Sequence, residues 1–201
     1  MRLFAFIGFV AVAAAVAAAV YFFGGFYSVA GSAEDPAAVN WALVRVRTAS
    51  IQRYATDKPP QNFGDPAMVQ EGARQYLEQG CATCHGAPGM KWAKFSEGLH
   101  PDPPDLKEVA GELTPQEVFW VIKNGINMTG MPSFAAAGAK DEDLWKVAAF
   151  VKKLPNVSDV DFKTWTNAQQ TAPTTPPAPA QHPAAAAPPP AQPAPAPENK
   201  P

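Results

Sequence analysis

The longest hydrophobic run in the sequence lies at the N-terminus. From Leu3 to Phe26 the chain carries no charged residue. A helix of this length would measure about 36 Å, against a bilayer hydrocarbon core of roughly 30 Å. The run also exceeds the apolar region of about 7–15 residues found in cleavable signal peptides. We therefore expect residues 3–26 to be embedded in a membrane as a single span.

The charges that flank this run predict its orientation. Arg2 precedes it, and Glu34 and Asp35 are the first charges after it. Positive residues tend to stay on the cytoplasmic side, so we expect the N-terminus inside and the rest of the chain outside. Two small-residue tripeptides, Ser28-Val29-Ala30 and Gly31-Ser32-Ala33, resemble cleavage sites and leave signal-peptide removal as the alternative.

A second helical pattern follows over Ala37–Tyr54, where Asp35-Pro36 is typical of an N-cap with proline at the first helical position. Arginines at 45, 47 and 53 give this helix a basic side. The helix either lies near anionic headgroups or a partner subunit, or packs on the following domain with its arginines in water. We expect the second arrangement. Lys58-Pro59-Pro60 then predicts a short rigid connector, with residues 55–63 swinging if the domain shuttles.

Three more helices are predicted from start and stop signals. Asp65-Pro66 opens a helix that runs to about Gln79, before Gly80. Thr114-Pro115 opens one that runs to about Lys123, before Asn124-Gly125. A last helix begins within residues 140–143 and runs to about Leu154. A loop rich in Gly and Pro fills residues 86–105. Because no segment shows a convincing strand alternation, the predicted fold class is all-α.

The C-terminal stretch has a different composition. Thr171–Pro201 holds 12 of the 23 prolines and almost no large apolar residue, so it cannot build a core and should be disordered or extended. It could be a spacer, contact a partner, or be merely solvated. The resulting domain plan is a transmembrane anchor at 1–30, a periplasmic helix and connector at 31–63, a folded domain at 64–165, and an Ala/Pro-rich tail at 166–201.

The formal net charge of −2 argues against nucleic acid as a partner, because duplex binding usually needs a basic excess. The chain has only two cysteines, which lie three positions apart and so do not form a disulfide framework.

The two cysteines belong to the pentapeptide Cys81-Ala82-Thr83-Cys84-His85, a Cys-x-x-Cys-His signature of covalent haem attachment. The sulfurs form thioethers with the two vinyl groups on one porphyrin edge, and His85 then sits under the ring as an axial ligand. A thioredoxin-like site would need a βαβ setting. A zinc site would need a second ligand pair, which His100 and His182 do not supply. A plain disulfide would leave His85 without a role. No further cysteine exists for a second haem.

Residues 64–155 resemble the class I c-type cytochromes. The features that carry the resemblance are a helix with Gly72 and Tyr76, the Cys-x-x-Cys-His-Gly motif, and Pro103-Pro104-Asp105-Leu106. Asn124-Gly125, the run Thr129-Gly130-Met131-Pro132, and a C-terminal aromatic helix follow in order. The resemblance implies a small cytochrome c fold of three to four helices around one haem c. It also implies a close contact between the first and last helices of the domain, here Gly72 against Phe150.

The same resemblance implies that Met131 is the second axial ligand. Met90 and Met128 are the other methionines within reach, and His100 would give a bis-histidine iron instead. The aromatic residues Trp92, Phe119, Trp120 and Trp145 are candidates for covering the porphyrin, with core packing as the simpler alternative.

The function implied is single-electron transfer between periplasmic-side redox proteins, or service as the electron-transfer subunit of a respiratory or dehydrogenase complex. We expect a protein that is not itself an enzyme, held in the bacterial plasma (inner) membrane with its haem domain on the periplasmic side. The alternative is a haem enzyme or gas-binding protein, which requires a displaceable sixth ligand.

Overall fold

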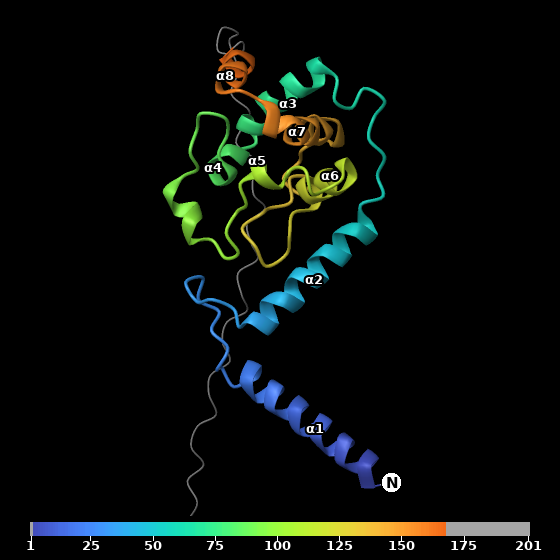
Figure 1. Cartoon of the computed structure of the whole chain (residues 1–201). Helices are drawn as coiled ribbons and strands as arrows, with labels where there is room; N and C mark the ends of the chain where they lie inside the picture. Colours follow the sequence, from blue (N-terminus) through green and yellow to red (C-terminus); the bar gives the residue numbers. More distant parts are fainter. Residues whose placement is uncertain (1, 168–201) are drawn as a thin grey trace, which may run out of the picture. The chain divides into compact units, whose positions relative to one another are not determined.

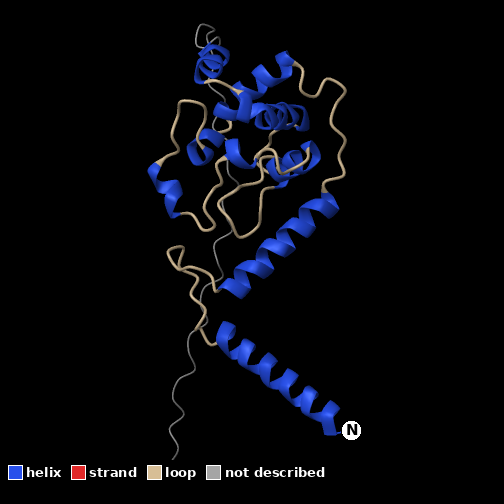
Figure 2. Ribbon diagram, in the orientation of Figure 1, coloured by secondary structure: helices blue, strands red, loops and turns tan. Residues whose placement is uncertain are grey.

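The computed structural model describes residues 2–167 and shows helices joined by loops, with no strand within that range (Figure 2). An isolated bridge between Ala87 and Met90 is the one β-type pairing there. The prediction of an all-α fold is confirmed. The tail expected from residue 171 onward lies outside the described residues.

The N-terminal helix α1 (Arg2–Phe23) is exposed along its whole length (Figure 1). Within the described residues it alone is long and apolar enough to cross a membrane, a property that signal sequences share. The helix ends before the expected limit at Phe26, because Gly24 and Gly25 form a turn in which Gly25 has φ 78°.

Helix α2 (Ala37–Tyr54) has the predicted bounds but not the predicted cap. Pro36 occupies the N-cap position, and the Asp35 side chain accepts a hydrogen bond from the Tyr27 hydroxyl instead of capping the helix. Of its side chains only Ile51 is buried. The expectation that the helix packs on the following domain therefore holds for its last turn alone.

The core of the domain is built by α3 (Pro66–Glu78), α6 (Pro115–Asn124) and α7 (Asp141–Lys153). All three are amphipathic, and α7 packs against both α3 and α6. Helix α6 begins with a capping box, in which Thr114 and Glu117 each bond to the other's backbone N–H. In α3, Asp65 is the N-cap residue as predicted, although its side chain makes no capping hydrogen bond.

Helices α3 and α7 cross at Gly72, which confirms the contact implied by the resemblance. A Cβ on Gly72 would collide with the Lys146 backbone carbonyl and would lie 3.0 Å from the Cβ of Phe150. Since any side chain would push the helices apart, this glycine sets their separation.

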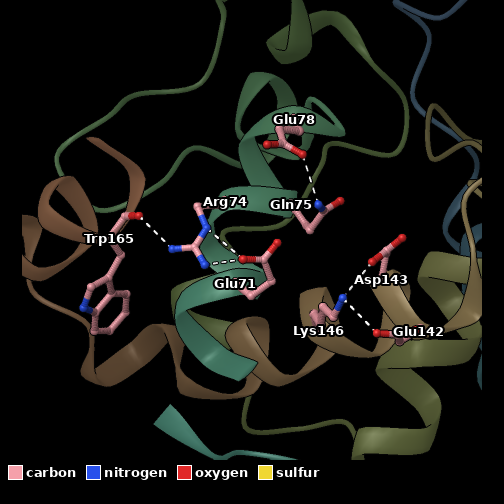
Figure 3. Close-up of polar contacts among 8 residues, drawn as sticks. All are labelled: Glu71, Arg74, Gln75, Glu78, Glu142, Asp143, Lys146 and Trp165. Atoms are coloured by element: carbon pink, nitrogen blue, oxygen red, sulfur yellow. Dashed lines mark hydrogen bonds and ion pairs between the residues drawn. The ribbon is translucent and has the colours of Figure 1, made fainter. Parts of the chain in front are cut away.

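Several short elements were not predicted. They are α4 (Cys81–His85), η1 (Lys94–Gly98), α5 (Leu106–Val109), η2 (Leu154–Asn156) and α8 (Asp159–Asn167). Helix α8 packs Phe162, which is 1% exposed, on Phe150 at a ring-centroid distance of 5.6 Å. Arg74 of α3 donates to the Trp165 carbonyl at 3.3 Å while it pairs with Glu71 (Figure 3). Helix α8 is therefore part of the folded domain.

The connector between α2 and α3 is held at both ends. At one end the Tyr54 ring stacks on Trp120 of α6, with centroids 6.5 Å apart. At the other end Phe63 packs edge-on against Trp145 of α7 at 5.8 Å. These aromatic contacts tie both ends of the connector to the domain in this structure, and the swinging of residues 55–63 during shuttling stays a prediction.

Candidate haem-binding site

The two cysteines and the histidine of the motif lie together on the short helix α4. Gly80, with φ 78°, closes α3 and turns the chain into α4. Residues three apart on a helix face the same side, so Cys81 and Cys84 project together. Both are free, partly exposed thiols. Burial raises the pKa of the Cys81 thiol to about 12, so this thiol is protonated at neutral pH.

The His85 ring is oriented by a backbone carbonyl. Its Nδ1 lies 2.9 Å from the Pro104 carbonyl oxygen. A carbonyl can only accept, so Nδ1 carries the proton and Nε2 keeps a free lone pair. Burial lowers the pKa of His85, and this outweighs the opposing effects of Pro104 and Asp105. The imidazole is therefore neutral at neutral pH, which is the form that binds a metal.

The segment that carries Pro104 is itself fixed. Asp105 caps α5 by accepting from the Lys107 backbone N–H at 2.8 Å. After α5, the carbonyls of Ala110 and Leu113 each accept a hydrogen bond from Lys152 Nζ of α7, both at 2.6 Å. The carbonyl that orients His85 is thus tied to the core helices.

Met131 lies in the loop between α6 and α7, and its side chain packs against the hydrophobic core. Its backbone N–H donates to Thr129 Oγ1 at 3.1 Å, and its carbonyl accepts from the Ile126 N–H at 3.1 Å. The Ser133 hydroxyl donates to the Lys123 carbonyl at the end of α6, at 2.8 Å. The first two bonds fold the loop on itself around Met131, and the third holds it against the end of α6.

The other ligand candidates have different surroundings. Met128 has φ 63° and a side chain that is 89% exposed. Met90 belongs to the turn directly after the motif, where its backbone pairs with Ala87. Met90 and His85 both line one small cleft. His100 is exposed.

The loop after the motif and the Met131 loop approach each other at Gly130. A Cβ on Gly130 would lie 2.9 Å from Leu99 Cδ1. Nearer the motif, a Cβ on Gly86 would lie 3.1 Å from the Met90 carbonyl oxygen and 3.5 Å from the Trp92 ring. The two loops that carry the ligand candidates are thus in contact.

The aromatic candidates divide between core and surface. Phe119 and Trp145 are buried and stack at 3.9 Å with nearly parallel rings, so they pack the core. Trp120 stacks on Tyr54, and Trp92 lies against Gly86 near the motif. Trp92 is therefore the aromatic residue of this set whose contacts lie beside the motif.

The residues present fit haem c by the chemistry of their donor atoms. Two thiols share one helix face for thioether bonds, a neutral imidazole offers Nε2, and a thioether is available in a neighbouring loop. Cys81, Cys84 and His85 would hold the group, and Met131 would come from another segment.

Sequence reasoning missed two contributors to this site. Pro104 was recognised as part of a loop, but its contact with His85 is made by a backbone carbonyl, which has no sequence signature. The Tyr76 hydroxyl donates to the Gly86 carbonyl at 2.7 Å, directly after the motif. A tyrosine at a core position of α3 was the available signal, because a buried phenol needs a partner.

Residues 67–151 match the family model described as "Cytochrome C oxidase, cbb3-type, subunit III". The match begins in α3, contains the motif and the Met131 loop, and ends within α7. No curated protein and no solved structure matches the chain.

Proposed function

We propose that this chain is a membrane-anchored, monohaem electron carrier or the electron-transfer subunit of a respiratory or dehydrogenase complex, because residues 67–151 match a c-type cytochrome family model and contain the haem-attachment signature. In this proposal haem c is held through Cys81 and Cys84, and His85 and Met131 are the axial ligands of its iron.

The observation that carries the proposal is the free Nε2 of His85, presented on the same short helix as the two cysteines. The Pro104 carbonyl fixes the ring by its bond to Nδ1, at 2.9 Å. An outer hydrogen bond of this kind sets the tautomer and orientation of a metal-binding histidine. A redox thiol site would not require this orientation of the imidazole. Zinc is disfavoured because, among the described residues, no group of three or more His, Cys, Asp or Glu side chains could hold a metal ion.

Three observations support Met131 as the second ligand. A ligand opposite His85 must come from a chain segment other than the one attached to the haem edge. Met90 lies in the turn that directly follows His85 and does not meet this condition. Met128 points into solvent, whereas Met131 packs against the core and its loop is bonded to α6.

When bound, the haem supplies a single-electron Fe(III)/Fe(II) couple, whose potential is raised by Met/His ligation. The contribution of the chain is to hold His85 and Met131 in the same places in both oxidation states, through the bonds to Pro104, Thr129 and the end of α6. With both axial positions filled, no position remains for a substrate, which favours outer-sphere electron transfer over catalysis.

The apolar helix α1 is compatible with a single-pass anchor. We place it in the bacterial plasma (inner) membrane with the haem domain on the periplasmic side, because Arg2 precedes it and acidic residues follow it. Confinement to the membrane plane raises the effective concentration of the domain near its redox partners. The matching family is described as an oxidase subunit, which supports a subunit role beside that of a mobile carrier.

In this proposal the domain plan is an anchor at 1–30, a helix and connector at 31–63, and a haem domain at 64–165. Residues 166–201 form the Ala/Pro-rich tail of this plan. Helix α8 runs to Asn167, so the folded part reaches two residues past the proposed boundary.

Binding of carbon monoxide to the reduced, detergent-solubilised chain tests the proposal. We expect no rapid uptake at neutral pH by the wild type, because Met131 occupies the sixth position. The Met131→Ala variant should bind carbon monoxide readily and serves as the positive control. Rapid uptake by the wild type would contradict the carrier and favour a gas-binding or enzymatic function.

A further inference from the structure

The hydroxyl of Tyr76 has a structural position that the proposed electron transfer does not yet use. Its side chain is 0% exposed, and the ring packs edge-on against Phe150 with centroids 5.2 Å apart. The hydroxyl donates to the Gly86 carbonyl oxygen at 2.7 Å. A buried phenol without a partner would be strongly unfavourable, so this bond and the packing of the ring depend on each other.

The acceptor, Gly86, is the residue that ends α4 directly after His85. Its N–H donates to the Ala82 carbonyl at 3.0 Å and its φ is 67°. A Cβ at this position would press on the Met90 carbonyl and the Trp92 ring. No following helical turn supplies a donor for the Gly86 carbonyl, and Tyr76 supplies one from α3.

We propose that Tyr76 is a positioning residue for His85, holding the backbone at the end of the haem-attachment helix while Pro104 holds the ring. This inference rests on the proposed ligation of the iron by His85. Two hydrogen bonds then act on neighbouring residues at the end of α4, one from Tyr76 to the Gly86 carbonyl at 2.7 Å and one from His85 Nδ1 to the Pro104 carbonyl at 2.9 Å. The bond from Tyr76 fixes the backbone from which the imidazole projects, and the bond to Pro104 fixes the rotation of the ring.

The donor side of the bond is rigid, which is what positioning requires. Tyr76 lies four residues after Gly72, on the face of α3 that crosses α7. Because Gly72 brings α3 against the Lys146 carbonyl and Phe150, the place of the hydroxyl is set by this close contact between α3 and α7. The position of the end of α4 therefore depends on the α3–α7 crossing.

The Tyr76→Phe variant of the full chain tests the inference, because it removes one oxygen and keeps the ring. We expect holoprotein whose oxidised electron paramagnetic resonance g-values and midpoint potential both shift from the wild type, since they report the orientation and strength of the axial ligand. The matched control is Thr166→Val, which removes a hydroxyl that donates to the Phe162 carbonyl at 2.8 Å in α8. That control should leave both readouts unchanged while it lowers thermal stability.

Unchanged g-values and potential in Tyr76→Phe would overturn the positioning function. The His85/Met131 ligation would then still stand on the wild-type spectrum, so the two failures are distinguishable. If Tyr76→Phe yields no holoprotein, the measurement is proton exchange of the Tyr76 hydroxyl in the reduced wild type by nuclear magnetic resonance. A slowly exchanging proton close to Gly86 supports the inference, and exchange as fast as that of an exposed tyrosine overturns it.

Discussion

At the scale of single residues, the Met131 loop depends on the backbone of Gly125. This glycine ends α6 with φ 68°, in the left-handed region. A Cβ there would lie 2.6 Å from the Met131 carbonyl oxygen and 2.6 Å from the Pro132 carbonyl carbon. The absence of a side chain therefore allows the loop to fold back against the helix end and brings Met131 to the core.

Gly125→Ala should destabilise the holoprotein by more than an alanine substitution does at a glycine whose added Cβ would meet no other atom. The control is Gly138→Ala in the same loop, where φ is 95° but a Cβ would meet nothing within 4 Å. We expect about 1–2 kcal/mol for the control from the left-handed backbone alone. Gly125→Ala should cost about 1–3 kcal/mol more than the control, because its Cβ would overlap the backbone of Met131 and Pro132. Denaturant unfolding measures both, and equal losses would contradict the account.

The difference between Met128 and Met131 shows what the sequence could and could not reveal about the site. Both methionines were placed in one loop, and resemblance alone favoured the second. The sequence does not show that Met128 adopts φ 63° and turns outward, because a single left-handed residue without glycine leaves no local pattern. The Pro104 carbonyl was equally invisible, since a backbone acceptor has no sequence signature.

At the scale of elements, the helices that could be predicted are those with local signals at their ends. The start signals Asp65-Pro66 and Thr114-Pro115 and the glycines at 80 and 125 predicted the bounds of α3 and α6 nearly as observed. Asp35 also has the sequence pattern of an N-cap, but its side chain accepts a hydrogen bond from the Tyr27 hydroxyl instead. This contact is tertiary, so the local sequence does not mark it. Helix α8 was missed although the Ser158 hydroxyl accepts from the Asp161 N–H at 3.1 Å, a capping signal that the sequence does contain.

The α3–α7 crossing leads to the second prediction. Gly72→Ala should destabilise the domain by about 1–3 kcal/mol or more, because its Cβ would meet the Lys146 backbone rather than a flexible side chain. Gly111→Ala, where a Cβ would meet nothing, serves as the control and should lie near neutral. The denaturation midpoint of each variant is the measurement. A Gly72→Ala protein as stable as the control would show that the helices are not in this contact.

The tie between α2 and the domain leads to the third prediction. Tyr54→Ala removes the ring that stacks on Trp120, so the last turn of α2 should open more often. We expect faster hydrogen–deuterium exchange at residues 51–55 of the full chain in detergent. Trp41→Ala, which changes a side chain that is 65% exposed, should leave that exchange as in the wild type. Equal exchange in all three proteins would show that the stacking of Tyr54 on Trp120 does not hold the last turn of α2 on the domain.

At the scale of the whole molecule, the chain combines an apolar helix with a domain whose surface is mildly acidic. Residues 63–165 carry 14 acidic against 10 basic residues. Helix α2 carries three arginines and no acid. The apolar length and the charge order were readable from sequence because both are one-dimensional properties. The packing of α2 was not, because it depends on which residues of α6 lie opposite its last turn.

The anchor gives the fourth prediction. The intact chain should remain in the membrane fraction after an alkaline carbonate wash, and mass spectrometry should find residues 1–30 on the mature protein. A variant with Leu3–Phe23 deleted and a cleavable signal peptide supplied in its place should be released as soluble holoprotein. A native mature N-terminus at Gly31 or Glu34 would contradict the anchor and show that the segment is a signal peptide.

The most direct test of the central claim is the near-infrared absorption spectrum of the oxidised, purified protein. His85/Met131 ligation predicts a weak sulfur-to-iron charge-transfer band in the wild type. The band should persist in Met128→Ala and disappear in Met131→Ala, since only the second change removes the proposed ligand. A wild-type protein without the band and with a high-spin spectrum, or a band that survives in Met131→Ala, would contradict the proposed ligation.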